Sequence, residues 1–163
     1  MNAKEVIRTL FRFNDQVMND YLKDLSDADL LVRPVSGANH IAWQLGHLIN
    51  AEANLAKMIP GTTPAEIPPG FAEKYTSETS KSDAAPGYLT KAEYLGMYQN
   101  VRTHSQKSLD ALPDADLDKP TEGRMAAIAP TVAAMFVLVA NHPMMHLGQF
   151  TVVRRKLGKP IAF

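Results

Sequence analysis

The sequence predicts an all-α fold, a four-helix bundle, from three observations. Four segments place apolar residues at steps of three and four, which aligns them on one face of a helix. Capping and stop signals stand at the ends of these segments. A long connection, residues 60–89, separates the second predicted helix from the third. Because a chain of 163 residues can bury one continuous core, residues 1–163 are predicted to form a single domain.

The balance of charges and the lack of cysteine exclude several classes of protein. Lys plus Arg and Asp plus Glu each number 17, so the formal net charge is zero. Without a basic field to attract phosphates, neither nucleic acid nor an anionic membrane is expected as a partner. Without cysteine, disulfides, thiolate ligands and a cysteine nucleophile are excluded, and any bound metal needs His, carboxylate or water ligands.

The expected location is the cytoplasm. The N-terminal stretch "MNAKEVIRTLFRFNDQ" mixes charged and apolar residues and lacks the uninterrupted apolar block of a secretory signal. The most apolar window, Met125 to Ala140, is shorter than the ~20 residues of a membrane-spanning helix and contains Pro130 and Thr131. We therefore interpret this window as the entry into a buried helix.

The first two predicted helices are amphipathic. Asn14 interrupts the apolar face of the first helix, and Asn39 is a candidate N-cap for the second, which runs to about Ile59. His47 lies at the edge of the second apolar face. The first face comprises Val6, Ile7, Leu10, Phe11, Val17, Met18, Tyr21, Leu22 and Leu25, and the second comprises Ile41, Leu45, Leu48, Leu55 and Ile59.

The third and fourth predicted helices have clearer end signals. Thr90 and Glu93 form a Thr-x-x-Glu capping box at the start of the third helix, and Pro113 ends it. The fourth helix is predicted over about 130–157, and Gly158 supplies its stop. Its apolar face comprises Val132, Met135, Val139, His142, His146, Phe150, Val153 and Leu157.

The connection 60–89 is longer than a usual helix-to-helix turn, which takes about 2–8 residues. It therefore crosses the bundle or covers a site, with Phe71 and Tyr75 as its expected anchors. A loop on the surface is the alternative, and the sequence leaves both open.

Two histidines fall on the apolar face of the fourth helix. His142 and His146 are four residues apart, so on a continuous helix their rings leave the same face one turn apart and could bind one metal ion. His47 is the natural third ligand, and three histidines leave coordination positions open for water or substrate. The alternative is a structural pair of buried histidines, whose ring nitrogens would each need a hydrogen-bond partner.

Three further residues are candidates for the surroundings of such a site. His40 lies about two turns before His47 and could line a pocket, act as an acid or base, or face solvent at the helix start. Asn14 could hydrogen-bond a ligand histidine or tie the first helix to the backbone of a neighbour. Gln149 lies one turn after His146 and could contact a metal-bound water, or serve in packing.

Two segments carry a resemblance to a known family. The segments "GANHIAWQLGHLINAE" (37–52) and "NHPMMHLGQFTVVRRKLGKP" (141–160), in this order and at this separation, resemble the DinB/YfiT-like superfamily of proposed metalloenzymes. The histidine of the family's second helix and its H-x-x-x-H-x-G-Q motif match His47, His142, His146, Gly148 and Gln149. The resemblance implies an up-down-down-up bundle, one divalent metal ion, often zinc or nickel, on the three histidines, and frequent dimerisation.

Pro143 stands between the two histidines of the pair, where many members of the superfamily have an acidic or other polar residue. It has no N–H to donate to the carbonyl of Val139, and its ring crowds that carbonyl, at a cost of ~3 kcal/mol in a regular helix. We therefore predict that the helix bends between Val139 and His142, or that a new helix begins at Asn141 or His142. Either change would re-aim His142.

The residues exclude two metalloprotein classes and leave two chemistries open. Pro143 occupies the position of the glutamate base in an H-E-x-x-H zinc protease, and the sequence lacks the Glu-x-x-His pairs of di-iron bundles. Three neutral histidine ligands would lower the pKa of a metal-bound water towards ~7, which favours hydrolysis of a small molecule. The resemblance adds a thiol S-transferase, because several members of the superfamily have this activity. The alternative is a non-catalytic metal- or ligand-binding protein, a dimeric stress-associated bundle.

Overall fold

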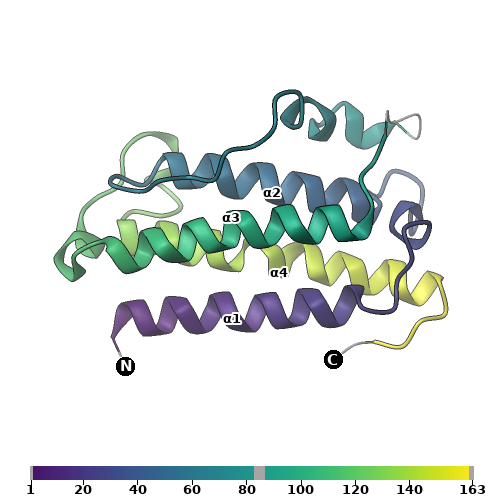
Figure 1. Cartoon of the computed structure of the whole chain (residues 1–163), viewed down its shortest axis with the longest axis horizontal. Helices are drawn as coiled ribbons and strands as arrows, with labels where there is room; N and C mark the ends of the chain where they lie inside the picture. Colours follow the sequence, from purple (N-terminus) through teal and green to yellow (C-terminus); the bar gives the residue numbers. More distant parts are fainter. Residues whose placement is uncertain (1, 83–86, 162–163) are drawn as a thin grey trace.

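The computed structural model describes residues 2–82 and 87–161, and four long helices dominate it (Figure 1). They are α1 (Ala3–Leu22), α2 (Ile41–Lys57), α3 (Lys91–Ala111) and α4 (Val132–Lys156). Short 3-10 helices lie in the connections: η1 (Asp29–Leu31), η2 (Ala72–Tyr75), η3 (Thr79–Lys81), η4 (Asp114–Asp118) and η5 (Gly123–Met125). The described ranges contain no β-strand. The predicted all-α four-helix bundle is confirmed.

The helices follow an up-down-down-up order. Figure 1 shows α1 and α4 running in one direction and α2 and α3 in the other. The connection after α2 returns along that helix to the start of α3, which is why these two consecutive helices are parallel. α1 packs mainly on α4 and α2 mainly on α3, and α2 also contacts α4. Within the described residues, no helix is both long and apolar enough to cross a membrane.

The predicted helix ends hold with one exception. Thr90 and Glu93 form both hydrogen bonds of the capping box that begins α3. The N-cap of α2 is His40, whose Nδ1 accepts a hydrogen bond from the backbone N–H of Trp43 at 3.1 Å. The prediction of Asn39 as this cap is wrong, because an unprotonated imidazole nitrogen one residue later accepts the same kind of bond.

The connection 60–89 is anchored on α2 by aromatic side chains. Residues 83–86 of this stretch lie outside the described part. Phe71 and Tyr75 are buried, as predicted, and η2 packs on α2. Tyr75 and Tyr94 of α3 share a hydrogen bond between their hydroxyl oxygens at 2.8 Å. The ring of Tyr75 lies against Gly46, where a Cβ atom would come within 2.1 Å of its Cε1 atom. The glycine is therefore what allows this anchor to contact the helix.

A layer of polar residues divides the core into two apolar clusters. Along α4, one cluster ends at Ala140 and the other begins at Leu147. Along α1, the same boundary falls between Phe11 and Val17. This polar layer comprises Asn14, Asp15, Glu52, Arg102 and Ser105. The histidines of α4 fall in the same gap of the apolar packing, so the chemistry-bearing residues are concentrated at one level of the bundle.

α4 continues through Pro143 without a break. The alternative of a new helix beginning at Asn141 or His142 is therefore wrong, and the bend between Val139 and His142 stays a prediction. The helix can continue because the carbonyl of Val139 receives a different donor, Nη1 of Arg102, at 3.2 Å. Such a side-chain donor removes the penalty of an unsatisfied buried carbonyl.

Candidate metal centre

Three histidines from two helices meet between α2 and α4. His47 comes from the middle of α2, and His142 and His146 come from successive turns of α4. One ring nitrogen from each can be chosen so that all three lie within 4.8 Å of one another. The ring centroids are 5.5 Å apart for His47 and His142, 5.2 Å for His47 and His146, and 5.0 Å for the α4 pair. The structure thus brings the predicted ligands together, although His47 lies nearly a hundred residues before the other two in the sequence.

The imidazoles of this group are held in the neutral form that a metal needs. Burial lowers the pKa of His47 below its usual value. Burial, reinforced by the charge of His47, lowers the pKa of His142 to about 4. Burial and the two neighbouring histidines lower the pKa of His146 to about 3. At neutral pH the rings are therefore unprotonated, and each retains a lone pair for coordination.

Gln44 orients the most buried ring of the group. Its Nε2 donates a hydrogen bond to the carbonyl of Asn39 at 2.9 Å, which fixes the direction of the side-chain amide. Its Oε1 therefore faces Nδ1 of His146, also at 2.9 Å. Because an amide oxygen only accepts, Nδ1 of His146 carries the proton, and the lone pair of Nε2 is left available for a metal ion. The residues thus fit a metal ion in two respects: the three rings are close together, and a hydrogen bond orients one of them.

Trp43 packs against the ring of His47. The indole stacks on His47 with centroids 5.2 Å apart and planes inclined by 7°. Its Nε1 donates to Oγ1 of Thr79 at 3.1 Å, which links the indole to η3. The 60–89 connection thereby supports the histidine group indirectly, through the indole that stacks on His47.

The other candidates have different roles from those expected of site residues. His40 is buried as the cap of α2, and its ring meets that of Tyr88 edge-on at 4.5 Å, so the expectation of a solvent-facing ring is wrong. Asn14 donates through Nδ2 to the carbonyl of Ala140 at 2.6 Å, which is the backbone tie considered for it. Gln149 is exposed on α4. Sequence reasoning missed Gln44, although it stands three residues before His47 on the same helix.

Replacing Gln44 tests the orientation of His146. We expect Gln44→Leu to weaken metal binding about 10- to 100-fold, because the ring loses the acceptor that fixes its tautomer. Titration of the protein with Zn²⁺ against a chromophoric chelator measures this loss. Gln44→Glu, which keeps an acceptor near Nδ1, should retain more of the affinity; equal losses in both variants would contradict this role.

An apolar hollow on α4 adjoins one histidine of the group, His142. It has a volume of about 390 Å³, and one of its walls is His142. The other lining residues are Ile128, Ala134, Val137, Leu138, Asn141 and Met145, none of which is charged. Ile128, Val137 and Met145 are exposed. A candidate metal ligand and an apolar surface are thus parts of one cavity.

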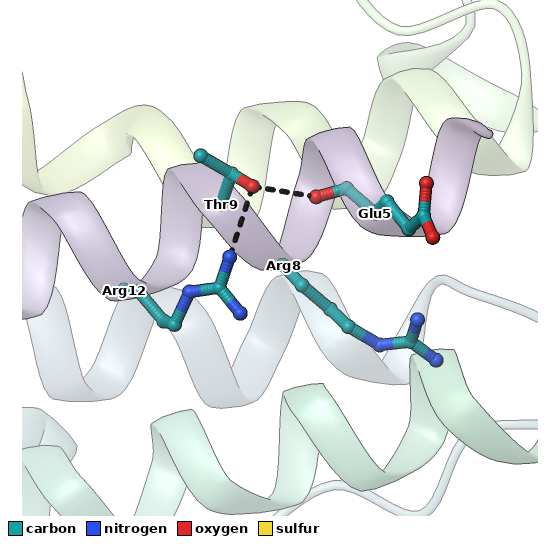
Figure 2. A pocket seen from close by; sticks show the side chains of 4 residues that line it. All are labelled: Glu5, Arg8, Thr9 and Arg12. Carbon is teal, nitrogen blue, oxygen red and sulfur yellow. Dashed lines mark hydrogen bonds between the residues drawn. The ribbon is translucent and has the colours of Figure 1, made fainter. Parts of the chain in front are cut away.

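A second hollow, on α1, has a different character. Figure 2 shows its lining residues, Glu5, Arg8, Thr9 and Arg12, which all come from this one helix. Arg12 donates to Oγ1 of Thr9, which in turn donates to the carbonyl of Glu5. Arg8 is paired with Asp110 of α3 at 2.6 Å. This hollow includes none of the three histidines, so its volume of about 450 Å³ does not make it the functional site.

The fold and the histidine group define an α-helical bundle with a candidate three-histidine metal centre. The sequence profile of the DinB superfamily matches residues 10–150, a range that contains all three histidines. The chain belongs to the DinB superfamily. No curated protein sequence matches it.

Proposed function

We propose that the protein binds one divalent metal ion, zinc or nickel, through His47, His142 and His146 and acts as a metal-dependent enzyme on small molecules. The observation that supports this most is that three neutral imidazoles place one ring nitrogen each within 4.8 Å of the others, and that Gln44 orients one of the rings. When bound, the ion would act as a Lewis acid on a coordinated water or thiol. Three uncharged ligands leave its positive charge uncompensated, which strengthens that effect.

The surroundings favour transfer of a thiol over hydrolysis. Glu52, the nearest carboxylate after His47 on α2, is turned into the polar layer, where it pairs with Nη1 of Arg102 at 3.2 Å. It is therefore not available as the base that would assist attack by water. Thiol transfer would need no such base, because a thiol held on a divalent ion would release its proton to solvent water, and its sulfur would then bond to the electrophile as the leaving group departs with its electron pair. A hydrolase remains the second candidate, and a non-catalytic metal-binding protein the third.

The apolar hollow beside His142 supports a substrate that carries a neutral alkyl or aryl group. Its lining has no charged side chain to bind a phosphate or carboxylate, and Asn141 supplies the one amide among the lining residues. A ligand that reached the metal past His142 would place its apolar part against Val137 and Met145. Removing that part from water would contribute to binding in proportion to the area covered.

A charge in this hollow should weaken use of an apolar substrate. We expect Val137→Asp to lower kcat/KM about 10-fold for a substrate with an alkyl or aryl tail, and to leave metal content unchanged, because Val137 is exposed and outside the histidine group. Val152→Asp is the matched control, since Val152 is similarly exposed on the same helix but lies outside the hollow. Equal effects of the two substitutions would exclude the hollow as the substrate site.

Metal content and activity together test the proposed function. Protein purified without a histidine tag should carry about one zinc or nickel ion per chain by mass spectrometry of the elements. Panels of hydrolase substrates and of a small thiol with electrophiles, each run with and without a chelator, separate the two chemistries. A loaded protein inactive in both panels would favour the non-catalytic alternative.

A single domain, a homodimer and a cytoplasmic location complete the proposal, and sedimentation velocity tests the dimer.

A further inference from the structure

Pro143 creates a local problem in the helix that carries two of the proposed ligands. In a regular α-helix the N–H of residue 143 would donate to the carbonyl of Val139, but proline has no N–H. Val139 and Ala140 are buried, so water is not available as the substitute donor. A buried carbonyl left without a partner is destabilising, and the affected turn leads directly into His142.

Arg102 of α3 supplies the donor that the Val139 carbonyl lacks, and it also reaches the carbonyl of Ala140. Its Nη1 lies 3.2 Å from the carbonyl of Val139, and its Nη2 lies 3.4 Å from that of Ala140. Asn14 of α1 donates to the same Ala140 carbonyl at 2.6 Å. Arg102 and Asn14 are 0% and 1% exposed, so these bonds are made in the interior, where competing solvent is absent.

Two carboxylates hold the guanidinium in place. Nε of Arg102 contacts Oδ1 of Asp15 on α1 at 2.8 Å, and its Nη1 contacts Oε2 of Glu52 on α2 at 3.2 Å. The guanidinium also lies over the aromatic ring of Phe11, with its central carbon 4.3 Å from the ring centroid. One side chain therefore joins the helix of His47, through Glu52, to the turn of α4 that precedes His142.

We propose that Arg102, with Asn14, is a positioning clamp for the metal centre. It binds the Val139 carbonyl, whose helical donor Pro143 removes, and the neighbouring Ala140 carbonyl, and so sets the place of the His142 turn relative to α2 and His47. This inference rests on the proposed metal binding. It assigns Arg102 a role distinct from that of a core ion pair, since an ion pair with Asp15 and Glu52 alone would stabilise the fold without any dependence on Pro143.

A double-mutant cycle between positions 102 and 143 distinguishes these roles. Arg102→Lys keeps the charge facing both carboxylates but loses the planar fork that also reaches the two carbonyls. We expect it to lower Zn²⁺ affinity about 10-fold in the wild-type background. In the Pro143→Ala background the loss should shrink to about 2-fold, because the N–H of the new alanine takes over the Val139 carbonyl.

The control is the other buried arginine of the bundle core. Arg154 is 1% exposed, pairs with Asp24 and lies on α4 beyond the histidines. Arg154→Lys should reduce resistance to urea but change Zn²⁺ affinity less than 2-fold. Should Arg102→Lys fail to fold, Glu52→Gln takes its place in the same cycle, because it removes the negative charge that holds Nη1 of Arg102 beside the Val139 carbonyl.

The outcomes separate this inference from the proposed function. Normal Zn²⁺ binding by the wild type, with equal losses from Arg102→Lys in both backgrounds, would overturn the clamp and leave metal binding standing. A wild type that binds no Zn²⁺ would defeat both. A loss that largely disappears with Pro143→Ala is the result expected from the clamp.

Discussion

His47→Ala should abolish stable metal binding, with a loss of affinity greater than about 100-fold. His47 is the only member of the histidine group that comes from α2, so its removal leaves two ligands on one helix and opens the site towards Trp43. The metal content of untagged protein should fall from about one ion per chain to less than about a tenth. Elemental mass spectrometry after gel filtration measures both values.

His104→Ala is the control for this substitution. His104 lies on α3 outside the group, and its Nδ1 meets the carbonyl of Asn100 at 3.0 Å. This variant should keep the metal content of the wild type. A metal-free wild type, or equal occupancy in wild type and His47→Ala, would defeat the three-histidine hypothesis.

Gly46→Ala should destabilise the protein by about 1–3 kcal/mol of unfolding free energy, although alanine is the better helix former. The added Cβ would lie 2.1 Å from Cε1 and 2.2 Å from Cζ of Tyr75. The ring cannot easily move aside, because it is buried and its hydroxyl is hydrogen-bonded to Tyr94. Urea unfolding followed by circular dichroism measures the change.

Two variants show whether the contact with Tyr75 is the cause. Gly148→Ala places the same methyl group at an exposed position of α4 with nothing within 4 Å, and should stabilise the protein by up to about 1 kcal/mol. In a Tyr75→Ala background, Gly46→Ala should cost nothing further, since the ring is gone. A cost that persists in this background would mean that the clash with Tyr75 is not its origin.

Local signals explain why the helices could be predicted so fully. The Thr90 capping box acts through atoms three residues apart, and the three- and four-residue apolar spacing is a property of one helix at a time. The pairing of His142 with His146 has the same origin, since i and i+4 side chains share a helix face. Such features depend on residues a few positions apart and can therefore be predicted from the sequence.

Apart from the cap of α2, the features that the sequence did not predict depend on partners distant along the chain. Gln44 acquires its role only because His146, more than a hundred residues later, is placed against it. The effect of Pro143 was predicted from its own helix as a bend or a break, whereas the break is avoided by a donor from Arg102 on α3. The local sequence pattern around either residue does not predict these contacts.

By itself, the sequence determined the helices, their main caps, the anchors of the 60–89 connection and the residue types available to a metal. The tertiary structure alone decided that His47 reaches the α4 pair, that Gln44 sets the tautomer of His146, and that the polar layer supports the turn before His142. The physical reason is how far apart along the chain the interacting residues lie. Hydrogen bonding and periodicity along one helix are settled by near neighbours, but the orientation of a ligand ring is settled by whichever side chains the packed helices bring to it.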